Sequence, residues 1–372
     1  MKQTIALKLA PSVEQAEVLL ATMERFNAAC DTIAEAAFAR RLANKIALQK
    51  LVYYDIRERF GLSAQLTIRA IAKVVEAYKR DKRVRPRFRP HGAVCYDQRI
   101  LRWLGVEAVS LSTLEGRLEV PIRFGAYQAA RADRRYGQAD LVYRDRVFYL
   151  YATIDTPEPP PGEPEDYLGI DLGIVNLAAD SDGTTYTGQA VERHRRIDVH
   201  RRRNLQRKGT KAARRKLRQL GRTRSRYQRD TNHCISKTVV RHAKGTQRGI
   251  ALEDLKGIRD RTERTVRRRQ RARHGNWSFD QLRSFIEYKA RAEGVQVVAV
   301  DPRGTSRTCP ECGHCDKANR RTQATFCCTR CGHAAPADTT AARNIASRAR
   351  AAVMRPNEGG ALKVSDTARA VA

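Results

Sequence analysis

The sequence has no long hydrophobic run. A membrane-spanning helix needs about 18 or more apolar residues in succession, and no stretch of the 372 residues approaches that length. The mean hydropathy is −0.59. The first residues, MKQTIALKLAPS, contain too short an apolar segment for a signal peptide, and their alternation is typical of a β-strand. We therefore expect a cytoplasmic protein without a membrane partner.

Acidic residues are scarce relative to basic ones. The chain has 40 Asp and Glu against 72 Lys and Arg, a formal net charge of +32, and its isoelectric point is near 10.4. Such an excess repels itself unless a polyanion neutralises it, which points to nucleic acid first and an anionic membrane second. The length is sufficient for two or three domains with substantial cores.

Cysteine is scarce outside a single cluster, which holds six of the nine residues. This distribution is typical of a metal site and not of a secreted disulfide framework. The spacing C-x₂-C-x₁₅-C-x₂-C, formed by Cys309, Cys312, Cys328 and Cys331, is that of a zinc site. Four thiolates close a tetrahedral Zn²⁺ with no open position, so we expect one structural zinc ion.

Neighbouring residues leave two questions open in this cluster. Cys315 and Cys327 could compete as ligands, whereas His314 and His333 are expected to be bystanders. The glycine after each Cys-x-x-Cys pair is expected to provide the permissive backbone that a tight turn around a metal needs.

The residue pattern of the N-terminal half predicts helices inserted into a β-barrel. Residues 12–50 are expected to be helical, with Ser12 as N-cap and Gln15 completing a capping box. A second helical block follows Phe60. The segment 79–89, KRDKRVRPRFR, is a basic connector expected to contact phosphate. Strands are predicted at 4–9, 94–100, 108–111, 117–120, 139–143 and 147–154.

The C-terminal half begins after the proline-rich segment PEPPPGEP. Strands are expected within 167–180 and at 184–187, 248–255 and 295–300, and helices at 277–294 and 339–353. The segment 193–230 carries seventeen Lys or Arg residues. A solvated helical hairpin is the simpler interpretation, but so many like charges on a helix favour a bound anion. Residues 259–273 are expected to form a loop.

The organising stretch is 167–180, YLGIDLGIVNLAAD. Its alternation predicts one core face, formed by Leu168, Ile170, Leu172 and Ile174. The opposite face carries Asp171 between Gly169 and Gly173. Glycine in a strand marks a turn or a close approach, and we expect it to leave room for a metal ion and a phosphate backbone. The alternative is an Asp that simply enters a turn.

Three acidic residues lie at the ends of predicted elements: Asp171, Glu253 and Asp338. The element order is that of a ribonuclease-H-like fold, in which the first and fourth strands are neighbours, so Asp171 and Glu253 can converge while the last helix brings Asp338. Clustered carboxylates stay ionised only if cations hold them. Two Mg²⁺ ions about 3.5–4 Å apart would clamp an in-line phosphodiester displacement.

Simpler roles remain open for each acid on spacing alone. Asp338 could be a helix N-cap, and Glu253 or Asp254 could pair with an arginine. Asp301 also ends a strand, but Pro302 after it favours a turn role.

The motifs together resemble the TnpB proteins, the OrfB-type proteins encoded by insertion sequences and related to type V CRISPR effectors. The matching segments are GIDLGIVNLA, ALEDL, W-S-F-x-Q-L, YK, TSRTCPECG, F-C-C-x-x-C-G and ADTTAARNI. They occur in the family's order, and the resemblance covers nearly the whole chain. The departures are Thr340, where the family usually has Asn, and Arg307, where it usually has Gln.

The resemblance implies a multi-domain α+β fold. The expected parts are a wedge-type β-barrel (1–10 and 93–156), an inserted helical recognition lobe (11–92), a proline-rich linker (157–165), an RNase H-like RuvC nuclease domain (166–304 and 335–354), a Cys₄ zinc ribbon (305–334) and a disordered tail (355–372).

The resemblance also implies an activity. TnpB proteins bind a noncoding guide RNA and cleave matching double-stranded DNA beside a short adjacent motif. The carried-over catalytic and Mg²⁺-binding residues are Asp171, Glu253 and Asp338, and the zinc ligands are the four cysteines above. We expect one monomer per RNA and, in a prokaryote, association with the nucleoid. The alternative is a non-catalytic RNA-guided or zinc-dependent DNA-binding regulator of transposition. A strand-transferring transposase is weaker, because nothing in the chain resembles a Tyr–His recombinase site.

Overall fold

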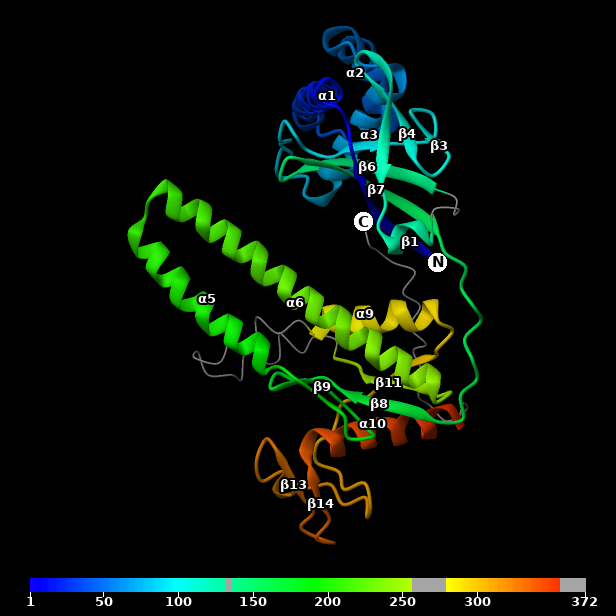
Figure 1. Ribbon diagram of the computed structural model, residues 1–372, viewed down its shortest axis with the longest axis vertical. Helices are drawn as coiled ribbons and strands as arrows, with labels where there is room; N and C mark the ends of the chain where they lie inside the picture. The colour runs from blue at the N-terminus through cyan, green and yellow to red at the C-terminus, as the bar shows by residue number, and fades with distance from the viewer. Residues whose placement is uncertain (132–135, 256–278, 355–372) are drawn as a thin grey trace. The chain divides into compact units, whose positions relative to one another are not determined.

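The structure is a computed structural model that describes residues 1–131, 136–255 and 279–354 (Figure 1). The chain divides into two compact units, Met1–Pro157 and Glu158–Ala372, each with its own core. The expected loop at 259–273, Trp277 and the expected disordered tail lie outside the described residues. Across the described part of the chain, every helix is either too short or too polar to cross a bilayer.

The first unit contains three long helices. They are α1 (Val13–Ala39), α2 (Lys45–Phe60) and α3 (Ala64–Arg80). The capping box at Ser12 and Gln15 is confirmed. The single helix expected over 12–50 is wrong, because the chain turns at Arg41, which has φ 51°, and restarts with Asn44 capping α2. Phe38, near the end of α1, is 38% exposed.

The second helical block expected after Phe60 is confirmed as α3, which carries a stripe of apolar residues. Its members are Leu66, Ala70, Ile71, Val74, Val75 and Tyr78, all buried. They pack into one core with α1 and the sheet of the same unit.

That sheet is antiparallel, barrel-like and seven-stranded, in the order β2-β6-β7-β1-β5-β4-β3. The strands are β1 (Lys2–Leu9), β2 (Val94–Tyr96), β3 (Leu101–Leu104), β4 (Ala108–Thr113), β5 (Gly116–Arg123), β6 (Tyr136–Arg144) and β7 (Val147–Asp155). The expected strand 94–100 is wrong in its length, since a turn at Asp97 separates β2 from β3. The short helix α4 (Ala126–Ala129) was not predicted.

The second unit is built on a mixed five-stranded sheet, ordered β10-β9-β8-β11-β12. The strands are β8 (Tyr167–Asp171), β9 (Asn176–Asp180), β10 (Thr185–Thr187), β11 (Gly249–Glu253) and β12 (Val297–Val300). The first three form an antiparallel meander, and β8, β11 and β12 are parallel. The predicted adjacency of the first and fourth strands is confirmed.

Helices cover both faces of this sheet (Figure 1). The C-terminal part of α6 (Lys211–Gly245) and α9 (Phe279–Ala292) pack on one face through Val239, Val240, Leu282 and Ile286. The opposite face is covered by α10 (Ala337–Met354). The basic segment forms a helical hairpin, in which α5 (Gln189–Lys208) lies against α6.

The cysteine-rich region follows β12. It contains the 3₁₀ turn η1 (Lys317–Asn319) and a hairpin of β13 (Thr325–Cys327) and β14 (Ala334–Pro336). Because β14 leads directly into α10, this region connects the last strand of the sheet to the last helix.

Candidate active site and metal centre

Two of the predicted acids lie at the carboxyl ends of adjacent parallel strands. Ile170 on β8 pairs with Leu252 on β11, so Asp171 and Glu253 are the next residue of each strand. Strands of a parallel pair end at the same edge of a sheet. The two carboxylates therefore come together because the register fixes them, as the sequence predicted.

Gly169 has a different role from the one expected. A Cβ at this position would lie 1.9 Å from the carbonyl oxygen of Ala342 and 2.7 Å from the amide nitrogen of Ala346. The close approach that requires glycine is that of the backbone of α10, and not that of a phosphate. Gly173 is constrained by the backbone of the turn, since its Cβ would lie 2.6 Å from the carbonyl oxygen of Asn176. The core face is also shorter than expected, because β8 ends at Asp171.

The contact between β8 and α10 positions the third acid. Asp338 lies in the first turn of α10, which begins at Ala337, so the N-cap interpretation is wrong. Its Oδ2 accepts a hydrogen bond from Asn176 Nδ2 at 2.9 Å, and its Oδ1 lies 3.4 Å from an Arg320 guanidinium nitrogen. A negative charge in the first turn is also stabilised by the helix dipole.

Glu253 is held by a hydroxyl group and not by an arginine. Its Oε1 accepts a hydrogen bond from Thr305 Oγ1 at 2.5 Å, and Thr305 is 2% exposed. The Asn344 side chain, on α10, donates to the Thr305 carbonyl oxygen at 2.7 Å. The arginine pair suggested for this position belongs to Asp254, whose Oδ1 lies 3.4 Å from Arg283.

Burial and repulsion between carboxylates disfavour the ionised forms of Asp171 and Glu253. Burial, then Glu253 and Asp338, raise the pKa of Asp171 to about 7, and Arg320 opposes the rise. Burial also raises the pKa of Glu253, while the Thr305 hydrogen bond lowers it. A carboxylate group of this kind fits a divalent cation, because the cation supplies the missing positive charge and prefers oxygen ligands.

Asp301, the residue after β12, lies close enough to Glu253 for its charge to raise the pKa of that carboxyl, but its own side chain makes a turn. Its Oδ1 accepts a hydrogen bond from the backbone amide of Arg303 at 3.0 Å, which makes a turn after β12. The turn role expected from the following proline is confirmed.

The four predicted zinc cysteines converge. Among the described residues, they form the group of potential metal ligands whose donor atoms all lie within 4.8 Å of one another; the three carboxylates are more widely spaced. The sulfur atoms pair across the two motifs, Cys309 with Cys331 and Cys312 with Cys328, each at 3.6 Å. Four sulfurs in this arrangement fit a tetrahedral zinc ion.

The two Cys-x-x-Cys turns have the same backbone geometry. Gly313 donates to the Cys309 carbonyl oxygen and Gly332 to that of Cys328, each at 3.0 Å. Both glycines have positive φ, 73° and 76°, as their predicted role requires. The backbone amide of Cys331 points at Cys328 Sγ at 3.5 Å, and this contact lowers the pKa of Cys328.

Cys315 and Cys327 lie outside the group of four. The two Cys-x-x-Cys turns are connected by the side chain of Asn319, which is fully buried. Its Nδ2 donates to the carbonyl oxygens of Arg307 and His314, and its Oδ1 accepts from the amide of Thr329 at 2.8 Å.

Sequence reasoning missed the polar residues that hold the acids and the cysteine turns. These are Asn176, Thr305, Asn319, Arg320 and Asn344. Thr305 and Asn344 lie inside motifs that carried the resemblance, TSRTCPECG and ADTTAARNI. No local pattern singles out these two residues, because their hydrogen-bond partners are distant in the chain.

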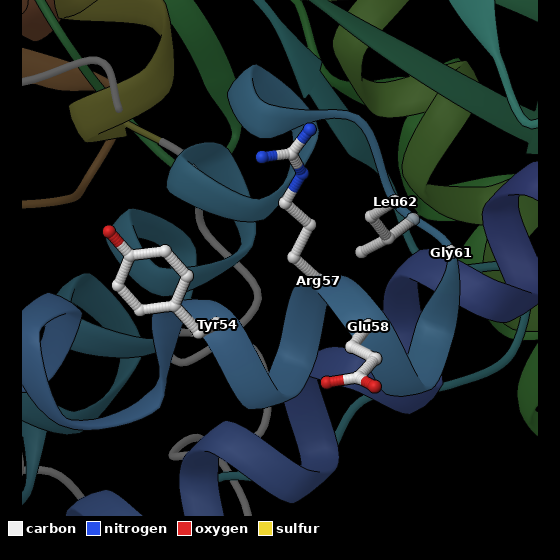
Figure 2. A pocket seen from close by; sticks show the side chains of 5 residues that line it. All are labelled: Tyr54, Arg57, Glu58, Gly61 and Leu62. Carbon is white, nitrogen blue, oxygen red and sulfur yellow. The ribbon is translucent and has the colours of Figure 1, made fainter.

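A separate pocket lies on the first unit. Tyr54, Arg57 and Glu58 project from α2, and Gly61 and Leu62 follow its end (Figure 2). Its lining has one carboxylate beside one guanidinium group, which does not resemble a multi-carboxylate centre.

Two family models match the chain. One, described as a probable transposase of the OrfB type, matches residues 149–273, and the other, described as a Cas12f1-like TNB domain, matches residues 279–345. Together they include the segments that carry Asp171, Glu253, Asp338 and the cysteine group.

Curated relatives agree with these matches. A CRISPR-associated endodeoxyribonuclease Cas12f1 from Sulfoacidibacillus thermotolerans is 35% identical over 196 residues, which cover 48% of this chain and 44% of that protein. The putative RNA-guided DNA endonuclease InsQ of Escherichia coli is 25% identical over 365 residues, 87% of each chain. A TnpB-like protein of Methanocaldococcus jannaschii is 35% identical over 116 residues, 31% of this chain and 41% of that protein. The chain thus spans less than half the length of the Cas12f1 relative.

Solved structures share the fold at low identity. A Cas12f1–sgRNA–target DNA complex contains a chain that aligns with TM-score 0.61 and 13% identity, over 93% of this chain and 98% of that one. The mini-RNA-guided endonuclease CRISPR-Cas_phi3 aligns with TM-score 0.56 and 10% identity, over 94% and 92%. The resemblance to TnpB is confirmed: this chain is similar to OrfB-type, TnpB-like and Cas12f proteins.

Proposed function

We propose that this protein is an RNA-guided DNA endonuclease encoded by a transposable element, which cleaves double-stranded DNA next to a short adjacent motif. The observation that carries the proposal is the placement of Asp171 and Glu253 on neighbouring strand ends, with Asp338 brought beside them by α10. The names of the relatives, RNA-guided DNA endonuclease and Cas12f1 endodeoxyribonuclease, support the same activity.

In this proposal the unit that contains the carboxylates is an RNase H-like RuvC nuclease domain, and residues 305–334 are a zinc ribbon. The barrel-like sheet of the first unit serves as the wedge domain, and its helices as the recognition lobe. The domain bounds remain those expected from the sequence.

Each residue of the site has a distinct task. Asp171, Glu253 and Asp338 are the ligands for two Mg²⁺ ions, which supply Lewis acidity toward the scissile phosphodiester when bound. Thr305 fixes one oxygen of Glu253 and leaves the other free. Asn176 orients Asp338, and the positive charge of Arg320 attracts an approaching phosphate.

The chain also provides a strongly basic surface for nucleic acid. The hairpin of α5 and α6 carries all seventeen Lys and Arg residues of 193–230, and most of their side chains are exposed. Pairing of the guide with the target strand supplies the sequence choice, while the protein binds the backbone and shape of the heteroduplex.

The test is cleavage of a plasmid by protein that is purified with its co-expressed RNA. With a matched guide, the adjacent motif and Mg²⁺, the wild-type complex is expected to cut, and EDTA is expected to prevent it. Asp171→Asn should abolish cutting while RNA binding is retained. Asp301→Asn, a nearby acid in a turn, is the matched control and should cut normally.

Cutting by Asp171→Asn would mean that the acids are wrongly assigned. An intact plasmid with the wild-type complex under all these conditions would instead favour the alternative, a non-catalytic RNA-guided or zinc-dependent DNA-binding regulator of transposition.

A further inference from the structure

The basic connector, defined here as residues 81–93 between α3 and β2, is fixed along α1 by its backbone. The amide of Phe88 donates to Asp31 Oδ1 at 2.8 Å. Asn27, one turn earlier on α1, donates to the carbonyl oxygens of Pro90 at 3.1 Å and Gly92 at 2.9 Å. A connector tethered at three points in this way does not depend on a partner for its course.

Side chains on the inner side of the connector are also engaged. Arg85 pairs with Glu35 on α1 at 2.8 Å, and the Phe88 ring lies 5.0 Å below the ammonium group of Lys73. Lys73 itself donates to the Ala93 carbonyl oxygen at 2.6 Å. These contacts engage Asp31 and Glu35 of α1 and fix Phe88 and Arg85 of the connector against this helix.

Arg83, Arg87 and Arg89 of the connector are exposed, and Arg83 lies in a turn that the Val84 amide closes on the Asp81 carbonyl oxygen at 3.3 Å. Among the described residues none of their side chains has a carboxylate partner, in contrast to Arg85. The prolines at 86 and 90 restrict the residues before them to extended conformations. Arg87 and Arg89 are two residues apart, and two residues of extended chain span about 6.6 Å, which is comparable with the spacing of successive phosphates along one strand.

We propose that the guanidinium groups of Arg83, Arg87 and Arg89 form a preset strip that binds phosphates of the guide RNA backbone, with Arg87 and Arg89 on successive phosphates. The choice of RNA rests on the proposed function, in which RNA is the partner that stays bound. Guanidinium groups suit this partner, because their planar donors match phosphate oxygens in pairs. The strip is independent of the carboxylate site and needs no base-specific contact.

The test measures RNA binding and not cleavage. Full-length protein is freed of nucleic acid in high salt and titrated with its own labelled co-purifying RNA from 0.15 to 0.5 M KCl. The variant is Arg83→Gln/Arg87→Gln/Arg89→Gln. The control, Lys45→Gln/Lys50→Gln/Arg57→Gln, removes the same charge from exposed positions of α2 in the same unit.

Loss of three phosphate contacts should weaken binding roughly 10- to 100-fold at 0.15 M KCl and reduce the salt slope by about 2. The control should change much less on both measures. Equal losses in the two variants would mean that only bulk charge matters, and a loss confined to a DNA duplex probe would overturn the assignment to RNA.

A second variant separates a preset strip from simple charge. Asp31→Ala removes the acceptor that fixes Phe88 and makes the protein one charge more positive. If the tether matters, RNA binding weakens several-fold; if charge alone governs binding, it strengthens, and the proposal fails. Protein that carries no RNA would instead count against the proposed function, while RNA bound equally by every variant would count against the strip alone.

Discussion

Gly169→Ala is the sharpest single test of how the active site is assembled. The added Cβ would lie 1.9 Å from the Ala342 carbonyl oxygen, whereas real Cβ contacts under 3.0 Å essentially never occur. Helix α10 must therefore recede by roughly 1 Å or more. Because backbone meets backbone, no side-chain rotation can relieve the clash.

The expected loss in the free energy of unfolding is about 3 kcal/mol, the upper part of the usual range for overpacking. The shift also carries Asp338 away from Asp171. A displacement of about 1 Å in a catalytic group can lower the rate about 100-fold. We therefore expect both the urea midpoint and the rate of plasmid cleavage to fall, while RNA binding is retained.

The matched control is Gly221→Ala on α6, where an added Cβ has nothing within 4 Å. This change should leave cleavage intact and be neutral or stabilising, since alanine favours a helix by up to about 1 kcal/mol. Wild-type stability and cleavage in Gly169→Ala would refute the close contact between β8 and α10.

Three further outcomes are expected. Thr305→Val leaves an oxygen of Glu253 unpaired, so a titration of the cleavage rate with Mg²⁺ should show a raised requirement for the ion and a lower maximum. Because burial and neighbouring acids raise the pKa of Asp171 from 3.8 to about 7, its contribution to stability is full below pH 4 and is lost as the pH rises through 7. Without added Mg²⁺, the Tm of the wild type should fall more between pH 5 and 8 than that of Asp171→Asn; parallel curves would contradict this. Metal analysis should find one zinc per chain, less in Cys328→Ser and an unchanged amount in Cys315→Ser, and the reverse order would exclude the proposed ligand set.

The sequence predicted that the first and fourth strands of the second unit are neighbours and that their acids converge, because strand patterns and the order of elements can be read from the sequence. Alternation over 167–171 and at 249–253 identified the two strands, and the right neighbours followed from the element order. The cysteine group was predictable for the same reason, since both pairs are set by short turns with glycine at positive φ.

What could not be predicted depends on contacts between distant segments. The role of Gly169 is set by Ala342, and the hydroxyl on Glu253 comes from Thr305, 52 positions away. The predicted helix boundaries were wrong where a single residue starts a new helix, as at Asn44, whose side chain caps the N-terminus of α2. A helical pattern alone does not reveal such a break.

Both ends of the cysteine region lie beside the acids proposed as the catalytic centre. Thr305 lies where the chain enters the cysteine region, and Asp338 lies where it leaves. Asn344 on α10 donates a hydrogen bond to the Thr305 carbonyl oxygen and so connects the two ends. It follows that the folded cysteine region holds Thr305, and with it Glu253, at a fixed distance from Asp338. Another small domain could replace the cysteine region only if its two ends were equally close to each other. Loss of the proposed zinc ion would disturb the positions of Glu253 and Asp338 before those of distant parts of the fold.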